Sequence, residues 1–303
     1  MNTFLAILTC FSYCFIFVMY TIKIAKYLKL PIHLRWELYP VMHEEAYHYG
    51  GSCFEKKDWW TYPRTKFLYR TFGYLLKDYL YFESYLKKGI TYWLFLYISH
   101  IGFILLMFLQ IIVILGAVLN LNGISVIKTS PYTLGYLLYF LTEFIGPLSF
   151  IAGIIGNFGL LIMRVIKSDL KLYTSPLMYY GYLFHILLYV SGFITWHKGN
   201  YSLIQYREFW EGLFKLQPID VTPDLAFFII LMGLHLLYLP FTRAIHYITR
   251  LFAFYLIRWD DKPNIRGGEL EKKIIEQLNK NVSWSGPHIE SGKRWSDQFT
   301  NSG

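Results

Sequence analysis

Two histidines lie in apolar stretches where an imidazole needs a chemical reason to be present. His100 lies in WLFLYISHIGFILLMFL, and His246 lies in LHLLYLPFTRAIHYITR. An imidazole within a lipid-embedded helix is costly unless it pairs, faces a cavity or binds a metal. Histidines from two facing helices can fill both axial positions of a haem iron, which favours electron transfer over oxygen binding. We therefore predict that His100 and His246 hold a b-type haem near the inner face; the alternative is that each bonds a carbonyl or hydroxyl of a neighbouring helix.

A second pair of histidines offers a further haem site. His235 precedes His246 by eleven residues, so the two would lie on one helix face roughly 16 Å apart, a separation that suits two stacked haems. His185, in GYLFHILLY, is the best remaining candidate as its partner. Otherwise His185 and His235 are core histidines or contact a quinone. His197 closes its apolar stretch and is expected at the outer interface.

Glu143, in FLTEFIGP, is a carboxylate within an apolar stretch. A buried carboxylate is expensive in a bilayer, and it can accept protons from a quinol. Pairing with a nearby hydroxyl or amide explains it equally well. Gln110 lies in the second apolar stretch where another haem ligand would be expected, but glutamine is not a usual haem ligand.

The elements that position these residues are apolar blocks long enough to cross a bilayer. The chain has 303 residues, of which 55% are apolar and 16% charged, whereas a soluble domain carries about 25% charged residues. A transmembrane helix needs about 20 predominantly apolar residues. The sequence predicts an all-α polytopic membrane protein with five spans, at Phe4–Ile24, Tyr92–Leu119, Tyr132–Val165, Met178–Trp196 and Leu225–Ile248.

The distribution of cationic residues predicts the orientation. Lys23, Lys26 and Lys29 follow the first apolar run, and no cationic residue precedes it. The positive-inside rule places this flank in the cytoplasm. The 29–90 stretch and the tail after Arg250 are also basic, so we predict an N-terminus outside and a C-terminus inside. The first run lacks the basic flank and the small-residue cleavage site of a signal peptide.

The alternation of apolar and polar stretches predicts four parts. They are a first transmembrane helix (1–28), a cytoplasmic loop (29–90), a four-helix haem-binding membrane bundle (91–250) and a cytoplasmic tail (251–303). The tail holds one helical pattern, LEKKIIEQL, and then a stretch with too little apolar content to fold alone. Trp284 and Trp295 in that stretch indicate that a partner covers it, because linkers rarely carry exposed tryptophans.

Charge and cysteine content exclude several classes of function. The net charge of +9 is spread along membrane flanks and forms no compact stripe for nucleic acid. Three cysteines make no disulfide framework. Cys10 and Cys14 lie one turn apart in the first apolar run, where packing explains them. Cys53 stands alone in the predicted loop and cannot hold an iron–sulfur cluster by itself.

Several separated motifs, spread over nearly the whole chain, resemble a known family. SHIGF in the second span and LYLPFTRAIHYITR in the fifth are similar to the membrane cytochrome b (gamma) subunit of respiratory nitrate reductase. The resemblance implies five spans, an N-out topology and two b haems. It places the inner haem ligands on His100 and His246. The outer pair would fall near Gln110 and Phe228, neither of which is a haem ligand, so a second haem would need other ligands.

The loops resemble one branch of that family. LRWELYPVMHE, YGGSCFE, DWW, RWDDKPN, VSWSGPHI and GKRW are similar to the branch found in sulfite-reductase-associated and heterodisulfide-reductase-like menaquinol-oxidising complexes. This resemblance implies menaquinol chemistry in the cell membrane of a prokaryote. It also implies a cytoplasmic iron–sulfur partner of the heterodisulfide reductase type, in which a thiol–disulfide reaction takes place.

The expected function is therefore that of a quinol-oxidising cytochrome b subunit within a multi-subunit oxidoreductase. Electrons from menaquinol would pass inward through the haem to the iron–sulfur partner. The partner would dock on the tail, at Trp259, Asp260, Asp261, Trp284 and His288. The alternative is a haem-free proton-coupled transporter or membrane anchor subunit, in which the intramembrane histidines and Glu143 shuttle protons or bind a substrate.

Overall fold

The structure is a computed structural model that describes residues 2–29, 81–87, 89–217, 219–242, 245–246 and 265–300. The chain divides into two compact units. One contains Met1–Phe17 and Leu80–Pro240, and the other contains Val18–Tyr79 and Phe241–Gly303. The predicted 29–90 loop falls mostly outside the described residues.

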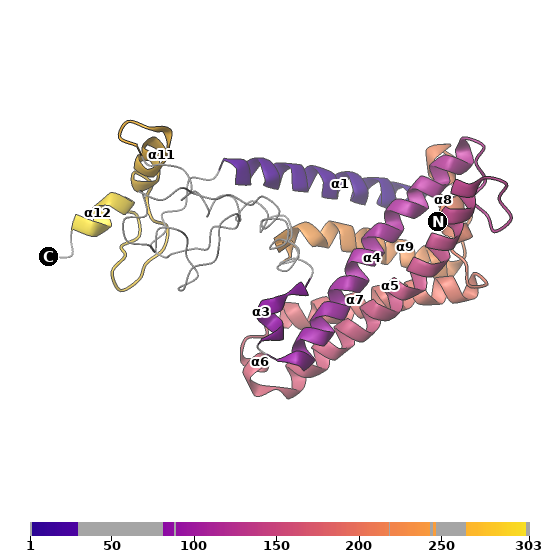
Figure 1. Cartoon of the computed structure of the whole chain (residues 1–303), viewed down its shortest axis with the longest axis horizontal. Coiled ribbons are helices and arrows are strands. Elements are labelled where there is room, and N and C mark those ends of the chain that lie inside the picture. The colour runs from indigo at the N-terminus through magenta and orange to yellow at the C-terminus, as the bar shows by residue number, and fades with distance from the viewer. Residues whose placement is uncertain are drawn as a thin grey trace, which may run out of the picture. The chain divides into compact units, whose positions relative to one another are not determined.

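The prediction of an all-α chain with five long apolar helices is confirmed. Five helices are long and apolar enough to cross a membrane, over Thr3–Leu28, Ile90–Leu121, Thr133–Ile166, Pro176–Lys198 and Pro223–Phe241. They belong to α1 (Asn2–Leu28), α4 (Ile90–Leu121), α5 (Thr133–Ile166), α7 (Pro176–Lys198) and α9 (Pro223–Tyr238) (Figure 1). The shorter elements are α3 (Glu83–Leu86), α6 (Ser168–Leu172), α8 (Ile204–Phe214), η4 (Leu239–Phe241), α11 (Glu269–Leu278) and α12 (Trp295–Thr300).

Prolines lie at the starts of α7 and α9 and just after α9, whereas Pro147 lies inside α5. Pro176 and Pro223 occupy the first turn of α7 and α9, where the missing N–H has no intrahelical partner to lose. The regular α-helix of the fifth span ends at Tyr238 and is followed by the 3-10 turn η4. Pro240 lies in that turn and cannot donate to a preceding carbonyl, which ends a regular α-helix. The predicted end at Ile248 lies outside the described residues.

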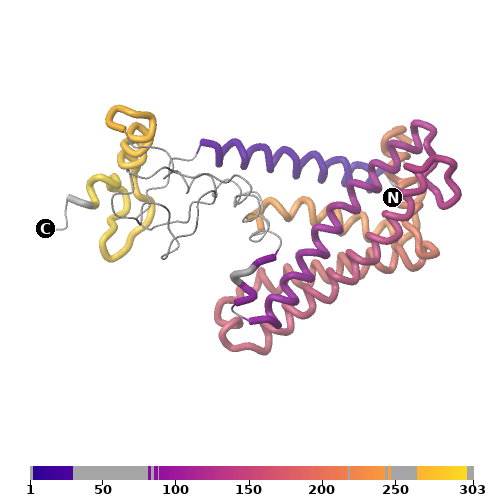
Figure 2. The backbone as a smooth tube through the Cα atoms, in the orientation of Figure 1, coloured from indigo at the N-terminus to yellow at the C-terminus, as the bar shows by residue number. Residues whose placement is uncertain are grey.

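Helix α5 packs against both α4 and α7 (Figure 2). Glycines allow the close approach of α4 and α5. A Cβ on Gly102 of α4 would lie 2.5 Å from the backbone nitrogen of Gly153 in α5, so only glycine fits there. One turn further along α5, a Cβ on Gly156 would collide with the backbone of Ser99. Small residues at helix contacts are the usual means of bringing transmembrane helices together.

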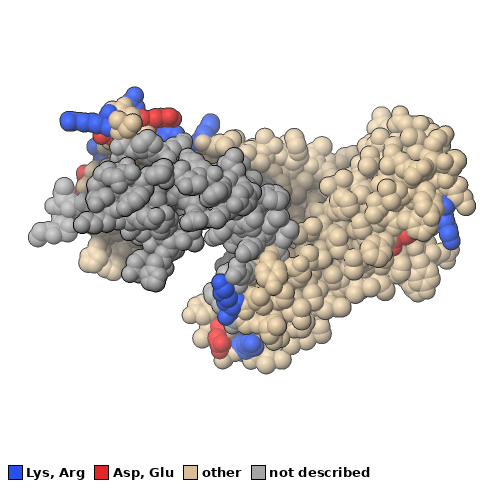
Figure 3. Space-filling model, viewed as in Figure 1, with Lys and Arg blue, Asp and Glu red and all other residues tan. Residues whose placement is uncertain are grey.

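The apolar core of the bundle is built around the short helix α8. Tyr206, Phe209 and Trp210 of α8 are buried together with Leu106 of α4 and Phe228 of α9. Helix α8 packs against α4, and α9 packs against α7. The face of this unit in Figure 3 carries charged side chains only toward its two ends. Such a distribution leaves the apolar middle for lipid.

The described part of the tail has more local structure than its composition predicts. Helix α11 is followed by two isolated β-bridges, Asn281 with Arg294 and Gly286 with Ile289, and then by α12. Val282 is buried within this segment. Two backbone bridges and the contact between Trp284 and Trp295 give this stretch local order, and whether it folds without a partner stays a prediction.

The contact between Gly102 and Gly153 gives a test of the bundle's packing. We expect Gly102→Ala to lower the free energy of unfolding by about 1–3 kcal/mol, because the new methyl group must push apart two backbones. Gly181→Ala is the matched control, since a Cβ there meets only the Tyr238 hydroxyl at 3.8 Å. Denaturation in mixed detergent micelles measures the free energy of unfolding of both variants. Equal stability of the two variants would show that α4 and α5 do not approach this closely.

Candidate functional site

His185 of α7 and His235 of α9 are brought together in the bundle. Their ring centroids lie 5.1 Å apart, with an interplanar angle of 78°. Helices α7 and α9 pack against each other, and the two imidazoles lie in the contact between them. Phe103 of α4 and Phe184 of α7 pack against the His235 ring at centroid distances of 5.9 and 6.3 Å. The pair therefore lies between helices and has apolar, aromatic walls.

His235 is fully buried, and neither of its ring nitrogens has a hydrogen-bond partner among the described residues. A neutral imidazole carries one donor and one acceptor. Leaving a polar group buried and unpaired costs about 1–3 kcal/mol. An imidazole in this state points to a ligand that occupies one of its nitrogens.

His185 has a defined tautomer. Its Nδ1 lies 2.6 Å from the backbone oxygen of Gly181, one turn earlier in α7. A carbonyl oxygen only accepts, so Nδ1 carries the proton, and in the neutral ring the lone pair is on Nε2. This hydrogen bond is the kind that orients a metal-binding histidine and raises its basicity.

His100 is held in the same way. Its Nδ1 lies 2.8 Å from the backbone oxygen of Leu96 in α4, and its ring packs against Phe82 at 4.6 Å between centroids. The predicted partner, His246, is exposed and lies beyond the end of α9. His246 belongs to the unit made of Val18–Tyr79 and Phe241–Gly303, whereas His100 belongs to the other unit. A haem held by these two histidines stays a prediction.

The donor set limits which metal group the pair could hold. No cluster of three or more histidine, cysteine, aspartate or glutamate side chains occurs among the residues that the structure describes. A zinc site would need three or four such protein ligands. A haem needs only two axial ligands, because the macrocycle supplies the other four. His185 and His235 supply the number of protein ligands that a haem needs, although their rings, 5.1 Å apart between centroids, would have to separate to admit one.

Glu143 of α5 binds the start of α8. Its Oε1 accepts hydrogen bonds from the Ser202 hydroxyl at 3.1 Å and from the Leu203 backbone N–H at 3.2 Å. This is the pairing with a hydroxyl and an amide that the sequence left open. Its Oε2 is buried and has no partner within the described part of the chain. Glu143 therefore anchors the start of α8 with one oxygen, and its role as a proton acceptor stays a prediction.

Gln110 is the centre of a group that sequence reasoning missed. Its Oε1 accepts hydrogen bonds from Tyr13 of α1, at 3.0 Å, and from Tyr206 of α8. We call these three side chains the Gln110 node. Burial raises the pKa of Tyr206 to about 12, so its hydroxyl stays protonated as a donor. Neither tyrosine shows a sequence pattern that separates it from the many others in the chain.

Two buried arginines were also missed. Arg164 of α5 donates to the hydroxyls of Tyr92, Thr174 and Tyr182, each at 3.0 Å. These bonds tie together α4, α5 and α7. Arg207 of α8 is 1% exposed and donates to the backbone oxygen of Val126. Burial lowers the pKa of the Arg207 guanidinium, and the nearby carboxylate of Glu143 opposes that shift.

The predicted docking residues are only partly described. Trp259, Asp260 and Asp261 lie outside the described residues. Trp284 is 52% exposed, although its ring packs against Trp295 at a centroid distance of 6.3 Å. His288 is exposed. Comparisons of the chain with family models, with curated proteins and with solved structures found no match.

The anchoring role of Glu143 can be separated from its acid–base role. We expect Glu143→Gln to keep stability within about 0.5 kcal/mol of the native chain, since the amide oxygen still accepts from Ser202 and Leu203. Glu143→Leu should lose about 1–3 kcal/mol, because it leaves a buried N–H and a hydroxyl unpaired. Thermal unfolding in detergent compares the two variants. The anchoring role is contradicted if the leucine variant is as stable as the glutamine variant.

Proposed function

We propose that this chain is a membrane cytochrome b subunit that carries electrons between menaquinol and a cytoplasmic iron–sulfur partner of the heterodisulfide reductase type. The observation that carries the proposal is the His185–His235 pair. One of these imidazoles is fully buried without a partner in the described structure, and the other has its Nδ1 proton fixed on a carbonyl. Two such rings, contributed by neighbouring spans, would hold a b-type haem.

The residues around the pair have separate roles in holding the group. Nε2 of His185 is the ligand atom, because the bond to Gly181 occupies Nδ1. Phe103 and Phe184 close the sides of the site and exclude water. A bound haem would supply reversible one-electron transfer, and its bis-histidine ligation would disfavour oxygen binding. The apolar walls keep the dielectric low, and this environment tunes the reduction potential of such a group.

A second haem, held by His100 and His246, remains part of the proposal. His100 has the same Nδ1 bond to a backbone carbonyl one turn earlier as His185 has. The repeated bond from Nδ1 to a backbone carbonyl supports a ligand role for both histidines. The resemblance in the SHIGF and AIHYITR motifs supports it independently. Two haems would supply two successive electron carriers.

The orientation and location follow from charge. We place the N-terminus outside and the C-terminus in the cytoplasm of a prokaryotic cell membrane, since Lys23, Lys26 and Lys29 follow the first span. Oxidation of menaquinol in the outer half releases two electrons and two protons. Oε2 of Glu143, buried without a partner among the described atoms, is the base that accepts one of these protons, and the other passes to the solvent outside. The electrons leave toward the cytoplasmic side.

The tail is the docking surface for the iron–sulfur partner. Trp284 and His288 are exposed on the described tail segment. A half-exposed tryptophan beside charged residues is a common anchor of protein interfaces. Electrons from the inner haem would reach the partner here, on the cytoplasmic side.

The proposal predicts a haem that depends on specific histidines. Detergent-purified, haem-replete protein should show the alpha band of a bis-histidine b haem after reduction with dithionite, and pyridine haemochrome analysis should give one or two haems per chain. His185→Ala and His235→Ala should each remove one haem, because an axial ligand is lost. His100→Ala and His246→Ala should remove the other.

His197→Ala is the control, since His197 is an exposed residue at the end of α7. It should keep the full haem content. Haem-replete expression that yields no bound haem would contradict the proposed function and favour the haem-free transporter or anchor. Haem content unchanged in His235→Ala would reject the α7–α9 site alone.

A further inference from the structure

The Gln110 node contains hydrogen-bond donors that nothing described in the structure accepts. The amide nitrogen of Gln110 is buried and has no partner among the described residues. The Gln110 side chain is 4% exposed. Its oxygen is held by the hydroxyls of Tyr13 and Tyr206, which fixes the direction of the amide plane. An amide that is oriented from two sides, with both of its N–H groups unused, is built to donate to a further oxygen.

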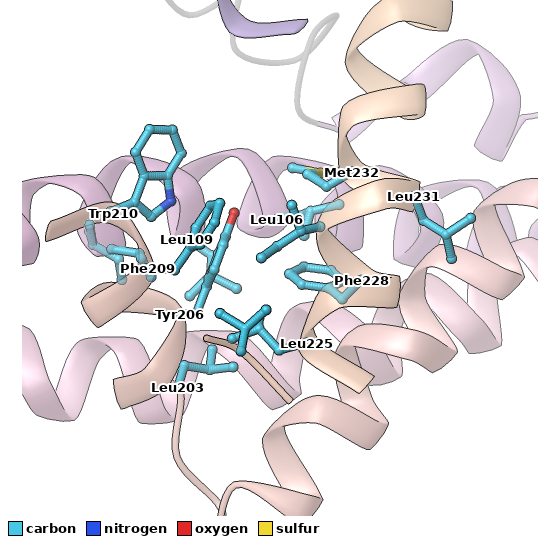
Figure 4. Close-up of a cluster of buried hydrophobic side chains, with 14 of the residues drawn as sticks. Leu106, Leu109, Leu203, Tyr206, Phe209, Trp210, Leu225, Phe228, Leu231 and Met232 are labelled. Carbon is cyan, nitrogen blue, oxygen red and sulfur yellow. The ribbon is translucent and has the colours of Figure 1, made fainter. Parts of the chain in front are cut away.

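The surroundings of the node are aromatic and apolar. Trp210 packs edge-on against Tyr13 at 5.0 Å between centroids, and Phe228 packs against Tyr206 at 5.5 Å. Figure 4 shows Tyr206 among Leu106, Leu109 and Phe228, with side chains from α4, α8 and α9 converging. A few convergent polar groups in an apolar enclosure are the usual composition of a small-molecule site.

We propose that the Gln110 node binds the head group of a quinone, with the Gln110 amide nitrogen donating to one ring oxygen. The ligand must be soluble in the membrane, planar enough to lie among aromatic rings, and able to accept from an amide. A quinone carbonyl meets all three requirements, and the hydroxyl oxygen of its reduced form can also accept. The identity of the ligand rests on the proposed function; the site rests on the unused donors.

The node is connected along α9 and α8 to the two groups that quinol oxidation needs. Phe228, which packs against Tyr206, precedes His235 by seven residues on α9, about 10 Å along the helix axis. Glu143 accepts the backbone N–H of Leu203, three residues before Tyr206 on the chain. A ring at the node therefore has an electron acceptor along α9 and a proton acceptor at the start of α8.

The test measures quinone binding to the full-length chain, purified in detergent with its haem. The probe is 2-methyl-1,4-naphthoquinone labelled with carbon-13 at its carbonyls. Infrared difference spectra should show one carbonyl stretch at lower frequency than in empty micelles, because a hydrogen bond weakens the C=O bond. Gln110→Met should abolish this shift and weaken binding by about tenfold, the size expected for losing a buried hydrogen bond.

Matched variants separate recognition from folding. Ser191→Ala removes a buried hydroxyl of α7 that donates to the backbone oxygen of Leu188, and it should keep the shift and the affinity. Tyr13→Phe and Tyr206→Phe keep both rings in the core but release the Gln110 oxygen. They should weaken binding a few-fold, and they serve as the test if Gln110→Met does not fold.

An unchanged carbonyl shift and affinity in Gln110→Met, or in both tyrosine variants, would overturn this site. Ordered water would then be the partner that remains for the Gln110 amide nitrogen. Because the infrared signal does not require haem, the two proposals fail separately. A chain that binds naphthoquinone through Gln110 but holds no haem contradicts the cytochrome alone. A chain that holds haem but shows no Gln110-dependent shift contradicts the quinone site alone.

Discussion

The account depends on the cost of a polar group inside a membrane bundle. Lipid offers no hydrogen bonds, so a polar side chain on a spanning helix must find a partner within the protein or bind a ligand. Most of the described polar groups in the bundle satisfy this rule locally; Thr142, Asn157 and Thr195, for example, each donate to a carbonyl of their own helix. His235 and the Gln110 amide nitrogen are among those that do not, together with Glu143 Oε2, Ser149 Oγ and the indole nitrogens of Trp196 and Trp210. His235 and Gln110 carry the functional proposals because each also lies beside aromatic rings from several helices.

Helix packing determines which of these exceptions can act together. The glycines of α5 let α4 and α7 each pack closely against α5. Helix α9 packs on α7, so that His235 faces His185. Helix α8 adds Tyr206 and Arg207 to the same bundle and is anchored by Glu143. Without α8, the oxygen of Gln110 would lose one of its two donors. Helix α8, which is too short to cross a membrane, therefore completes the polar site of the long helices.

Much of the fold was predictable from the sequence, because a run of about 20 apolar residues has few stable alternatives in a membrane. The first four spans match the described helices closely, and the regular α-helix of the fifth ends at Tyr238, before Pro240. The sequence offered His185 only as the best remaining partner of His235, because counting along the two spans placed it nearer the inner face. The Gln110 node was not, since hydrogen bonds from Tyr13 and Tyr206 depend on which faces of α1, α4 and α8 meet. Sequence spacing within one helix carries no such information.

An experimental density map of the haem-replete protein tests the central claim most directly, because it shows the space between α7 and α9 itself. The account predicts a planar macrocycle whose iron is bound by His185 and His235, with Nδ1 of His185 still bonded to the oxygen of Gly181. A map in which the two imidazoles bond only to each other, to water or to other side chains, with no macrocycle between them, would contradict it.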